Sequence, residues 1–267
     1  MFSAERYFDR IGWRGPLSLT LDTLASLVRA HMTRIPFENL DVLLGRGVRI
    51  DLDSVFAKLV DSKRGGYCFE QSTLFRAALE HVGFQPVAHA ARVIMLTPRQ
   101  SAPRTHMFLT VSISGTTYVL DPGFGGQGPL VPVPLVENIE TRDGPDVHRF
   151  TRRDGEWVLE ARIGGTMSPL WMSTLEPESP IDFVMGNHYT STYPESGFVQ
   201  RLMLSARGPR GRRVSVMNRD VTIANNGTVQ KSQLADRAAL RALLTHEFGI
   251  DVPEVERLRI PTVPEWP

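Results

Sequence analysis

The chain has 267 residues, enough for one large domain or two to three small ones with sizeable cores. Its 42% hydrophobic and 22% charged residues are typical of an ordinary globular protein. The formal net charge of +1 gives no overall basic surface, so we expect neither nucleic acid nor a membrane as a partner. A single cysteine forms no intrachain disulfide, which suits a reducing compartment.

The first residues, MFSAERYFDRIGW, include acidic side chains and no apolar segment of the kind found in secretory signals. No stretch approaches the ~18 uncharged apolar residues of a membrane span. We therefore expect a cytoplasmic protein.

Residues 1–85 are predicted to be helical. Apolar residues recur at helical spacing over 21–28 and 69–82. Asp51 is a suitable N-cap for a helix that follows it, and Gly83 a suitable end for the helix before it.

Residues 86–190 are predicted to form antiparallel strands. Ser114-Gly115 and Asp154-Gly155 each separate two runs of β-forming residues, which is typical of hairpins. The prolines at 129, 132 and 134 exclude a helix between these hairpins. The pattern favours a small barrel or sandwich.

Residues 191–267 begin with a polar, turn-rich link around residue 190. Strands are predicted over 198–206, 213–218 and 221–224, with a turn at Asn226-Gly227. A helix from about Leu234 to Gly249 follows. Helices, then strands, then a mixed end predict the α+β class.

The cysteine lies in RGGYCFEQ (64–71), where two glycines precede a helical pattern. A cysteine is a nucleophile only as the thiolate, and the first turn of a helix favours negative charge. Cys68 is thus either an activated nucleophile or a small buried residue, and this segment alone favours the buried residue.

His106 and Asp121 change that balance. Each lies about seven residues from the Ser114-Gly115 turn, so pairing of the two strands brings them to the same end of one hairpin. An Asp that accepts from one imidazole nitrogen orients the other toward a thiol, which predicts a Cys–His–Asp triad. A lone histidine at a strand start is otherwise more often a surface residue.

Three further patterns predict no separate site. The other histidines show no metal-ligand spacing, so we expect them at surfaces or edges and expect no metal: His31, His81, His89, His148, His188 and His246. GFGGQG (123–128) precedes prolines instead of a helix, which excludes a dinucleotide fingerprint; its glycines favour close approach to a ligand or the thiol. RGPRGRR (207–213) is a solvated hairpin tip or a contact for an anionic cosubstrate.

Four motifs together resemble the arylamine N-acetyltransferases: IPFENLDVLLGR (35–46), RGGYCFEQ (64–71), RTHMFLTV (104–111) and YVLDPGFGG (118–126). The resemblance covers about residues 1–200, with a looser likeness beyond. It implies an N-terminal helical bundle (1–85), a central antiparallel β-barrel (86–190) and a C-terminal α/β lid (191–267), around a cysteine-proteinase-like core. Its triad corresponds to Cys68, His106 and Asp121.

The resemblance also implies an activity in xenobiotic metabolism. Acetyl-CoA donates an acetyl group to the cysteine in a ping-pong mechanism, and the acceptors are arylamines, arylhydrazines and sometimes N-hydroxyarylamines. The acceptor pocket corresponds to Phe37, Phe124 and Phe198. Regions near the coenzyme correspond to Ala102, Pro103, Arg104, Thr105, Gly125 and Gly126.

Two structural features follow from the same likeness. Arg64 and Glu38 are expected to pair and hold the nucleophile's loop. Ser72 departs from the family, which commonly has Asn there, one helical turn beyond the thiol.

Two other functions remain open from the residues alone. A transglutaminase-like cysteine hydrolase or amidase uses the same triad in the same order. A non-catalytic binding protein would keep Cys68 buried and slow to alkylate.

Overall fold

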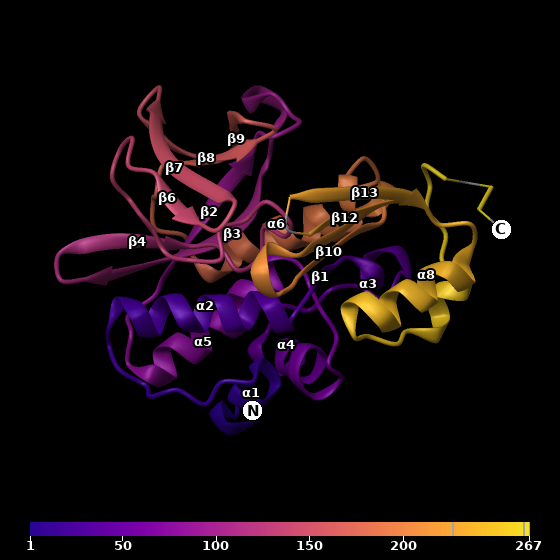
Figure 1. Cartoon of the computed structure of the whole chain (residues 1–267), viewed down its shortest axis with the longest axis horizontal. Coiled ribbons are helices and arrows are strands. Elements are labelled where there is room, and N and C mark those ends of the chain that lie inside the picture. The colour runs from indigo at the N-terminus through magenta and orange to yellow at the C-terminus, as the bar shows by residue number, and fades with distance from the viewer. Residues whose placement is uncertain (226, 264, 267) are drawn as a thin grey trace.

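The protein is described by a computed structural model that covers residues 1–225, 227–263 and 265–266. Helices α1, α2, α4 and α5 lie beneath a β-barrel, and a second sheet lies beside the barrel with α8 at its outer end (Figure 1). The predicted α+β class is confirmed. Within the described ranges, no helix is long and apolar enough to cross a membrane.

Two predicted helix ends, at Asp51 and Gly83, can be compared with the structure. The helices are α1 (Ala4–Ile11), α2 (Leu21–Arg34), α3 (Leu40–Leu43), α4 (Leu52–Phe56), α5 (Cys68–Val82), α6 (Pro180–Thr192), α7 (Gly197–Gln200) and α8 (Arg237–Leu243). π-Helical turns extend two of them, η1 (Ala57–Asp61) after α4 and η4 (Leu244–Phe248) after α8; 3₁₀ turns are η2 (Arg99–Ser101), η3 (Pro209–Gly211) and η5 (Pro253–Arg257). Asp51 caps α4 by accepting from the Ser54 N–H, and Gly83 ends α5 at φ +106°, as predicted.

The barrel is an eight-stranded antiparallel sheet in the order β5-β4-β3-β2-β9-β8-β7-β6. Its strands are β2 (Val87–Val93), β3 (Arg104–Ile113), β4 (Thr116–Leu120), β5 (Val133–Pro134), β6 (Thr141–Asp143), β7 (Asp146–Arg153), β8 (Glu156–Ile163) and β9 (Thr166–Ser173). It nearly closes where the Asn138 N–H donates to the Phe150 carbonyl at 2.8 Å. Both predicted hairpin turns have positive φ at their two central residues.

The second sheet has the order β1-β10-β11-β12-β13. Its strands are β1 (Phe37–Glu38), β10 (Met203–Arg207), β11 (Arg213–Met217), β12 (Asp220–Asn225) and β13 (Thr228–Gln233). Its core includes Leu204 and Val214, together with Leu240 and Leu244 from the predicted C-terminal helix. Asn226, in the turn predicted between the last two strands, lies outside the described residues.

The structure differs from the prediction in two segments near residue 190. Helix α6 occupies part of the predicted strand region. The sequence did not predict this helix because its outward face is apolar, with Ile181, Val184 and Met185 exposed. Phe198 lies in α7, so the predicted strand begins only at Met203. The domain limits 1–85, 86–190 and 191–267 stay a prediction.

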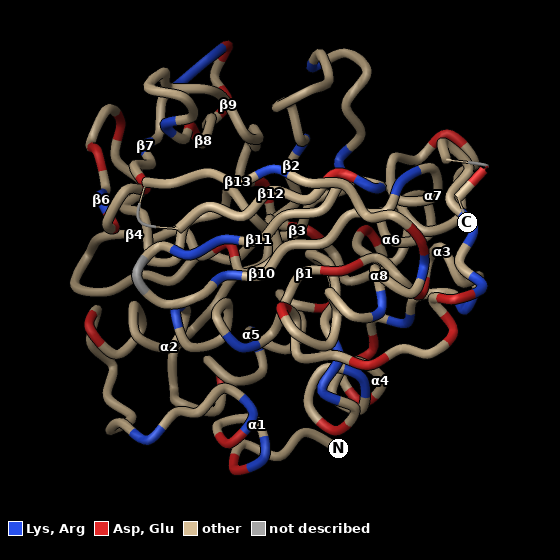
Figure 2. Tube along the Cα trace, turned by 45° about the vertical axis from the view of Figure 1, so that its right-hand side comes forward, with Lys and Arg blue, Asp and Glu red and all other residues tan. Residues whose placement is uncertain are grey.

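Charge is mixed over the molecule. Figure 2 shows basic and acidic residues in proximity around the whole trace, in keeping with the net charge of +1. Among the described residues, the distribution of charge therefore does not point to a site, so the site is described from the sheets and helices around it.

Candidate active site

The only cysteine is the first residue of α5, directly after the two glycines that bring the chain to it. A Cβ on Gly65 would lie 2.2 Å from the Pro36 carbonyl oxygen, a distance that real side chains do not show. The Gly66 N–H donates to that same oxygen, and the Gly66 carbonyl accepts from the Glu38 N–H, both at 3.2 Å. The glycines thus allow the nucleophile's loop to lie directly against the segment 36–38.

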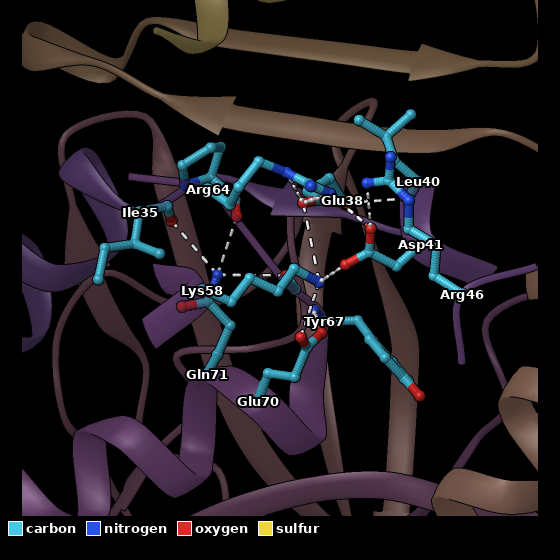
Figure 3. Close-up of polar contacts among 12 residues, drawn as sticks. Ile35, Glu38, Leu40, Asp41, Arg46, Lys58, Arg64, Tyr67, Glu70 and Gln71 are labelled. Atoms are coloured by element: carbon cyan, nitrogen blue, oxygen red, sulfur yellow. Dashed lines mark hydrogen bonds and ion pairs between the residues drawn. The ribbon is translucent and has the colours of Figure 1, made fainter. Parts of the chain in front are cut away.

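A buried cluster of charged side chains contacts this loop (Figure 3): Glu38, Asp41, Lys58, Arg64 and Glu70. The predicted pair is present: Nη2 of Arg64 lies 2.7 Å from Oε1 of Glu38. Lys58 adds contacts that the sequence did not reveal, 2.8 Å to Asp41 and 2.7 Å to Glu70. Glu70 also accepts from the N–H of Tyr67, the residue that caps α5. The cluster therefore ties the start of α5 to the segment 38–41.

A second polar chain approaches the loop through the helical core. Tyr7 Oη lies 2.9 Å from His31 Nδ1, and His31 Nε2 lies 2.7 Å from Gln71 Oε1. The Gln71 amide in turn donates to the Gly66 carbonyl at 3.2 Å. Burial lowers the pKa of His31 to about 3, against an opposing effect of the Gln71 hydrogen bond, so the imidazole is neutral.

The expectation that the six remaining histidines lie at surfaces or edges is wrong for three of them. His31, His89 and His148 are buried, and each has a hydrogen-bond partner that makes burial tolerable. Isolated polar residues in a sequence do not show which partner awaits them.

The structure brings the three predicted triad residues together. Nε2 of His106 lies 3.0 Å from both carboxylate oxygens of Asp121. Cys68 Sγ lies 3.6 Å from the carbonyl oxygen of Thr105, the residue before the histidine. Cys68 and His106 are each 3% exposed and Asp121 is 0% exposed, so the group is shielded from bulk water.

His106 is held in a charge-stabilising environment. Burial by itself lowers the pKa of His106, but the charge and hydrogen bond of Asp121, with a contribution from Cys68, raise it to about 10. Since Nε2 is engaged by Asp121, Nδ1 is the ring nitrogen left for another partner.

The glycine-rich segment after Asp121 lies against the nucleophile and the second sheet. A Cβ on Gly123 would lie 2.4 Å from the Cys68 Cα, and one on Gly126 would lie 3.0 Å from Ser205 Oγ. The Gly126 carbonyl accepts from Arg207 at 2.5 Å. The close approach expected of these glycines is therefore present.

Arg207 and Arg213 are not a solvated hairpin tip. Arg207 is buried and both arginines pair with Asp146 of β7, Arg213 at 2.7 Å. They join the second sheet to the barrel, because Arg207 lies on β10 and Arg213 on β11 while Asp146 lies on β7.

The three predicted aromatic residues are half-buried around this group. The Phe124 ring meets His106 edge-on, with centroids 5.3 Å apart. The ring centroids of Phe37 and Phe198 lie 6.1 Å apart. A Cβ on Gly125 would lie 3.3 Å from the Phe37 ring. Half-buried rings beside a thiol offer apolar area to a flat ligand.

The segment 102–105 leads directly into His106. The Ala102 carbonyl accepts from Arg92 at 2.6 Å, and Pro103 is half-buried. Arg104 is paired with Glu178. Arg104 is thus already neutralised by a protein carboxylate.

Sequence reasoning missed Trp171 and Asn187 near the triad and noted Ser72 without a contact for it. Trp171 donates its indole N–H to Asp121 Oδ2 at 2.8 Å. Asn187, on the unforeseen helix α6, accepts from the Tyr67 hydroxyl. Ser72 Oγ donates to the Met107 carbonyl at 3.0 Å, which shows what the departure from Asn does here. Among the contacts that the sequence did not reveal, only that of Glu70 with the cap of α5 had a local signal, its place three residues after Tyr67.

In the part of the chain that the structure describes, no group of three or more His, Cys, Asp or Glu side chains is arranged to hold a metal ion.

Comparisons with known proteins agree on one family. The family model described as N-acetyltransferase matches residues 20–257. The arylamine N-acetyltransferase of Escherichia coli is 34% identical over 94% of this chain and 90% of its own. The solved structure of the M. tuberculosis enzyme has a TM-score of 0.90 and 36% identity, covering 95% of this chain and 96% of that one. The solved structure of the Mycobacterium marinum arylamine N-acetyltransferase in complex with CoA has a TM-score of 0.90 and 33% identity, covering 95% of this chain and 94% of that one. The chain therefore belongs to the arylamine N-acetyltransferase family of acyltransferases.

Proposed function

We propose that the protein transfers an acetyl group from acetyl-CoA to the nitrogen of arylamines or arylhydrazines through an acetyl-Cys68 intermediate. The observation that carries this proposal is the Cys68–His106–Asp121 arrangement at the start of α5. Membership of the family supports the donor and the class of acceptor.

In the first half-reaction, Cys68 and His106 act as a thiolate–imidazolium pair. Sγ forms a bond to the acetyl carbon, and the bond between that carbon and the CoA sulfur breaks. His106 gives its proton to the departing CoA thiolate. The Cys68 N–H, in the first turn of α5, has no acceptor among the described residues and would donate to the oxyanion.

In the second half-reaction, the amine nitrogen attacks the acetyl carbon of the thioester. His106 takes the proton that the nitrogen loses, and the Cys68 thiolate leaves. Asp121 keeps the imidazole oriented throughout, because it accepts from the opposite ring nitrogen.

The surroundings fit these two substrates. Phe37, Phe124 and Phe198 would contact the aromatic ring of the acceptor and exclude water that would hydrolyse the thioester. The segments 102–105 and 125–126 flank the triad and are proposed to contact the coenzyme; a related structure is described in complex with CoA.

Mass spectrometry tests the intermediate directly. Protein incubated with acetyl-CoA should gain one acetyl group on Cys68 and release CoA, and addition of an arylamine should remove that group as acetylated amine. Because Cys68 is the only cysteine, Cys68→Ala is a clean control and should neither gain the group nor transfer it. Transfer at the parent rate by this variant would contradict the proposal, and acetate release without any amine product would favour a hydrolase.

A further inference from the structure

Trp171 lies near the end of β9, and its side chain reaches the Asp121 carboxylate. On β9 it is paired with Leu159 of β8 and Val93 of β2, so its backbone position is fixed from both sides. Its side chain is fully buried and stacks on Phe108 at 4.3 Å between ring centroids. This packing fixes the position of the indole, and its N–H donates to the Asp121 carboxylate.

The hydrogen bonds of Asp121 show what this contact adds. His106 Nε2 is the same distance, 3.0 Å, from both carboxylate oxygens, so this contact alone does not select a rotation of the carboxylate. Trp171 Nε1 lies 2.8 Å from Oδ2 only. The indole thus breaks the symmetry and fixes the plane of the carboxylate against the imidazole.

The charge on Asp121 also needs this donor. Asp121 is fully buried, and a buried carboxylate requires hydrogen bonds that replace those of water. Among the described residues, the titratable groups that act on His106 are Asp121 of the β4 end and Cys68 of α5. From β2, His89 stacks on the ring of Phe108 at 5.4 Å and is engaged with Thr110. Phe108 and Phe124 provide apolar surroundings.

We propose that Trp171 is a positioning residue for acetyl transfer, which holds the Asp121 carboxylate in the orientation that pairs with His106. It acts through Asp121 and touches neither substrate nor thiol. This inference rests on the proposed function, since it assigns Trp171 a part in activating Cys68.

The variant Trp171→Phe removes the N–H and keeps an aromatic ring on β9. Without the donor, the carboxylate loses its fixed orientation against the imidazole, so the thiolate–imidazolium pair is less stable and is lost at a higher pH on the acid side. The rate of Cys68 alkylation by iodoacetamide should therefore fall at a higher pH than in the parent, with the midpoint of the acid limb raised by about one unit, and kcat/KM should drop about tenfold or more, as for loss of a hydrogen bond to a charged group.

Trp157→Phe is the matched control, because Trp157 lies on the neighbouring strand β8 and has aromatic contact with Phe150 instead of the triad. It should alkylate with the parent pH profile. Loss of packing alone would lower the midpoint of thermal unfolding in Trp171→Phe and leave the alkylation midpoint unchanged, and that result would overturn the proposal.

A measurement on the parent protein covers the case in which Trp171→Phe does not fold. The chain has four tryptophans, so indole ¹⁵N labelling gives few signals, and substitution of the other three assigns that of Trp171. Its N–H resonance should move with the same midpoint as Cys68 alkylation; a resonance that does not respond refutes the proposal. Alkylation needs no acetyl-CoA, so a shifted profile without any acetyl adduct would refute only the proposed function.

Discussion

Gly123→Ala should misplace the nucleophile without unfolding the protein. Gly123 lies two residues after Asp121 and directly against the start of α5. A methyl group there would lie 2.4 Å from the Cys68 Cα, 3.0 Å from its Cβ and 3.1 Å from its carbonyl oxygen. None of these atoms belongs to the end of a flexible side chain, so the backbone itself has to move.

The size of the movement sets the size of the effect. Carbon atoms in contact prefer separations near 3.5 Å, so the two segments have to part by about 1 Å. A shift of about 1 Å at a reacting group costs roughly a hundredfold in rate, whereas overpacking of this kind costs about 1–3 kcal/mol of stability. We expect kcat/KM for acetyl transfer to fall about a hundredfold, with a folded protein of somewhat lower unfolding midpoint.

The assay measures CoA release in the first turnover and kcat/KM with an arylamine, together with thermal unfolding. Gly197→Ala is the matched control, because a Cβ at Gly197 meets no atom within 4 Å. A Gly123→Ala protein with activity within twofold of this control would show that the contact with Cys68 does not fix the geometry of the site.

Two further predictions concern buried hydrogen bonds. Ser72→Ala removes the donor to the Met107 carbonyl and should lower the free energy of unfolding in urea by about 1–2 kcal/mol and kcat/KM several-fold, because Met107 follows His106. The control Ser112→Ala changes an exposed residue on β3, the strand of Met107, and should cost less. Equal losses in the two variants would contradict this account. The pKa of His31 is lowered from 6.5 to about 3 by burial, so below pH 6.5 the unfolded chain binds a proton that the folded protein does not. Stability should therefore decline by up to a few kcal/mol as the pH falls from 6.5 toward 3, and less so in His31→Gln; parallel urea-midpoint curves for the two proteins would refute this.

The triad could be predicted because its information is local. One turn signal at Ser114-Gly115 fixes the register of β3 and β4, and that register carries His106 and Asp121 to one end. Cys68 follows a glycine pair and begins a helix, which is also a local pattern. The fold class followed from the change of hydrophobic period along the chain.

The supporting contacts could not be predicted because they join distant segments. Trp171 meets Asp121 across 50 positions, through a register that shifts at a bulge between Leu159 and Glu160. The contact therefore depends on how the barrel curves, which no short stretch of sequence encodes. Helix α6 was missed for a different reason: its exposed apolar face removes the polar stripe by which a surface helix is recognised.

The two-residue strand β1 makes the active site depend on the order in which the chain is synthesised. Its Glu38 binds Gly66 on one side, and its partner on the other side is Leu204 of β10, which leaves the ribosome much later. Asn39 adds a bond from the Met203 N–H to its side chain at 2.8 Å. Until β10 has been made, β1, which lies against the loop that presents Cys68, lacks its partner strand. A chain that ends before β10 would therefore carry the Cys68 loop beside an unpaired β1.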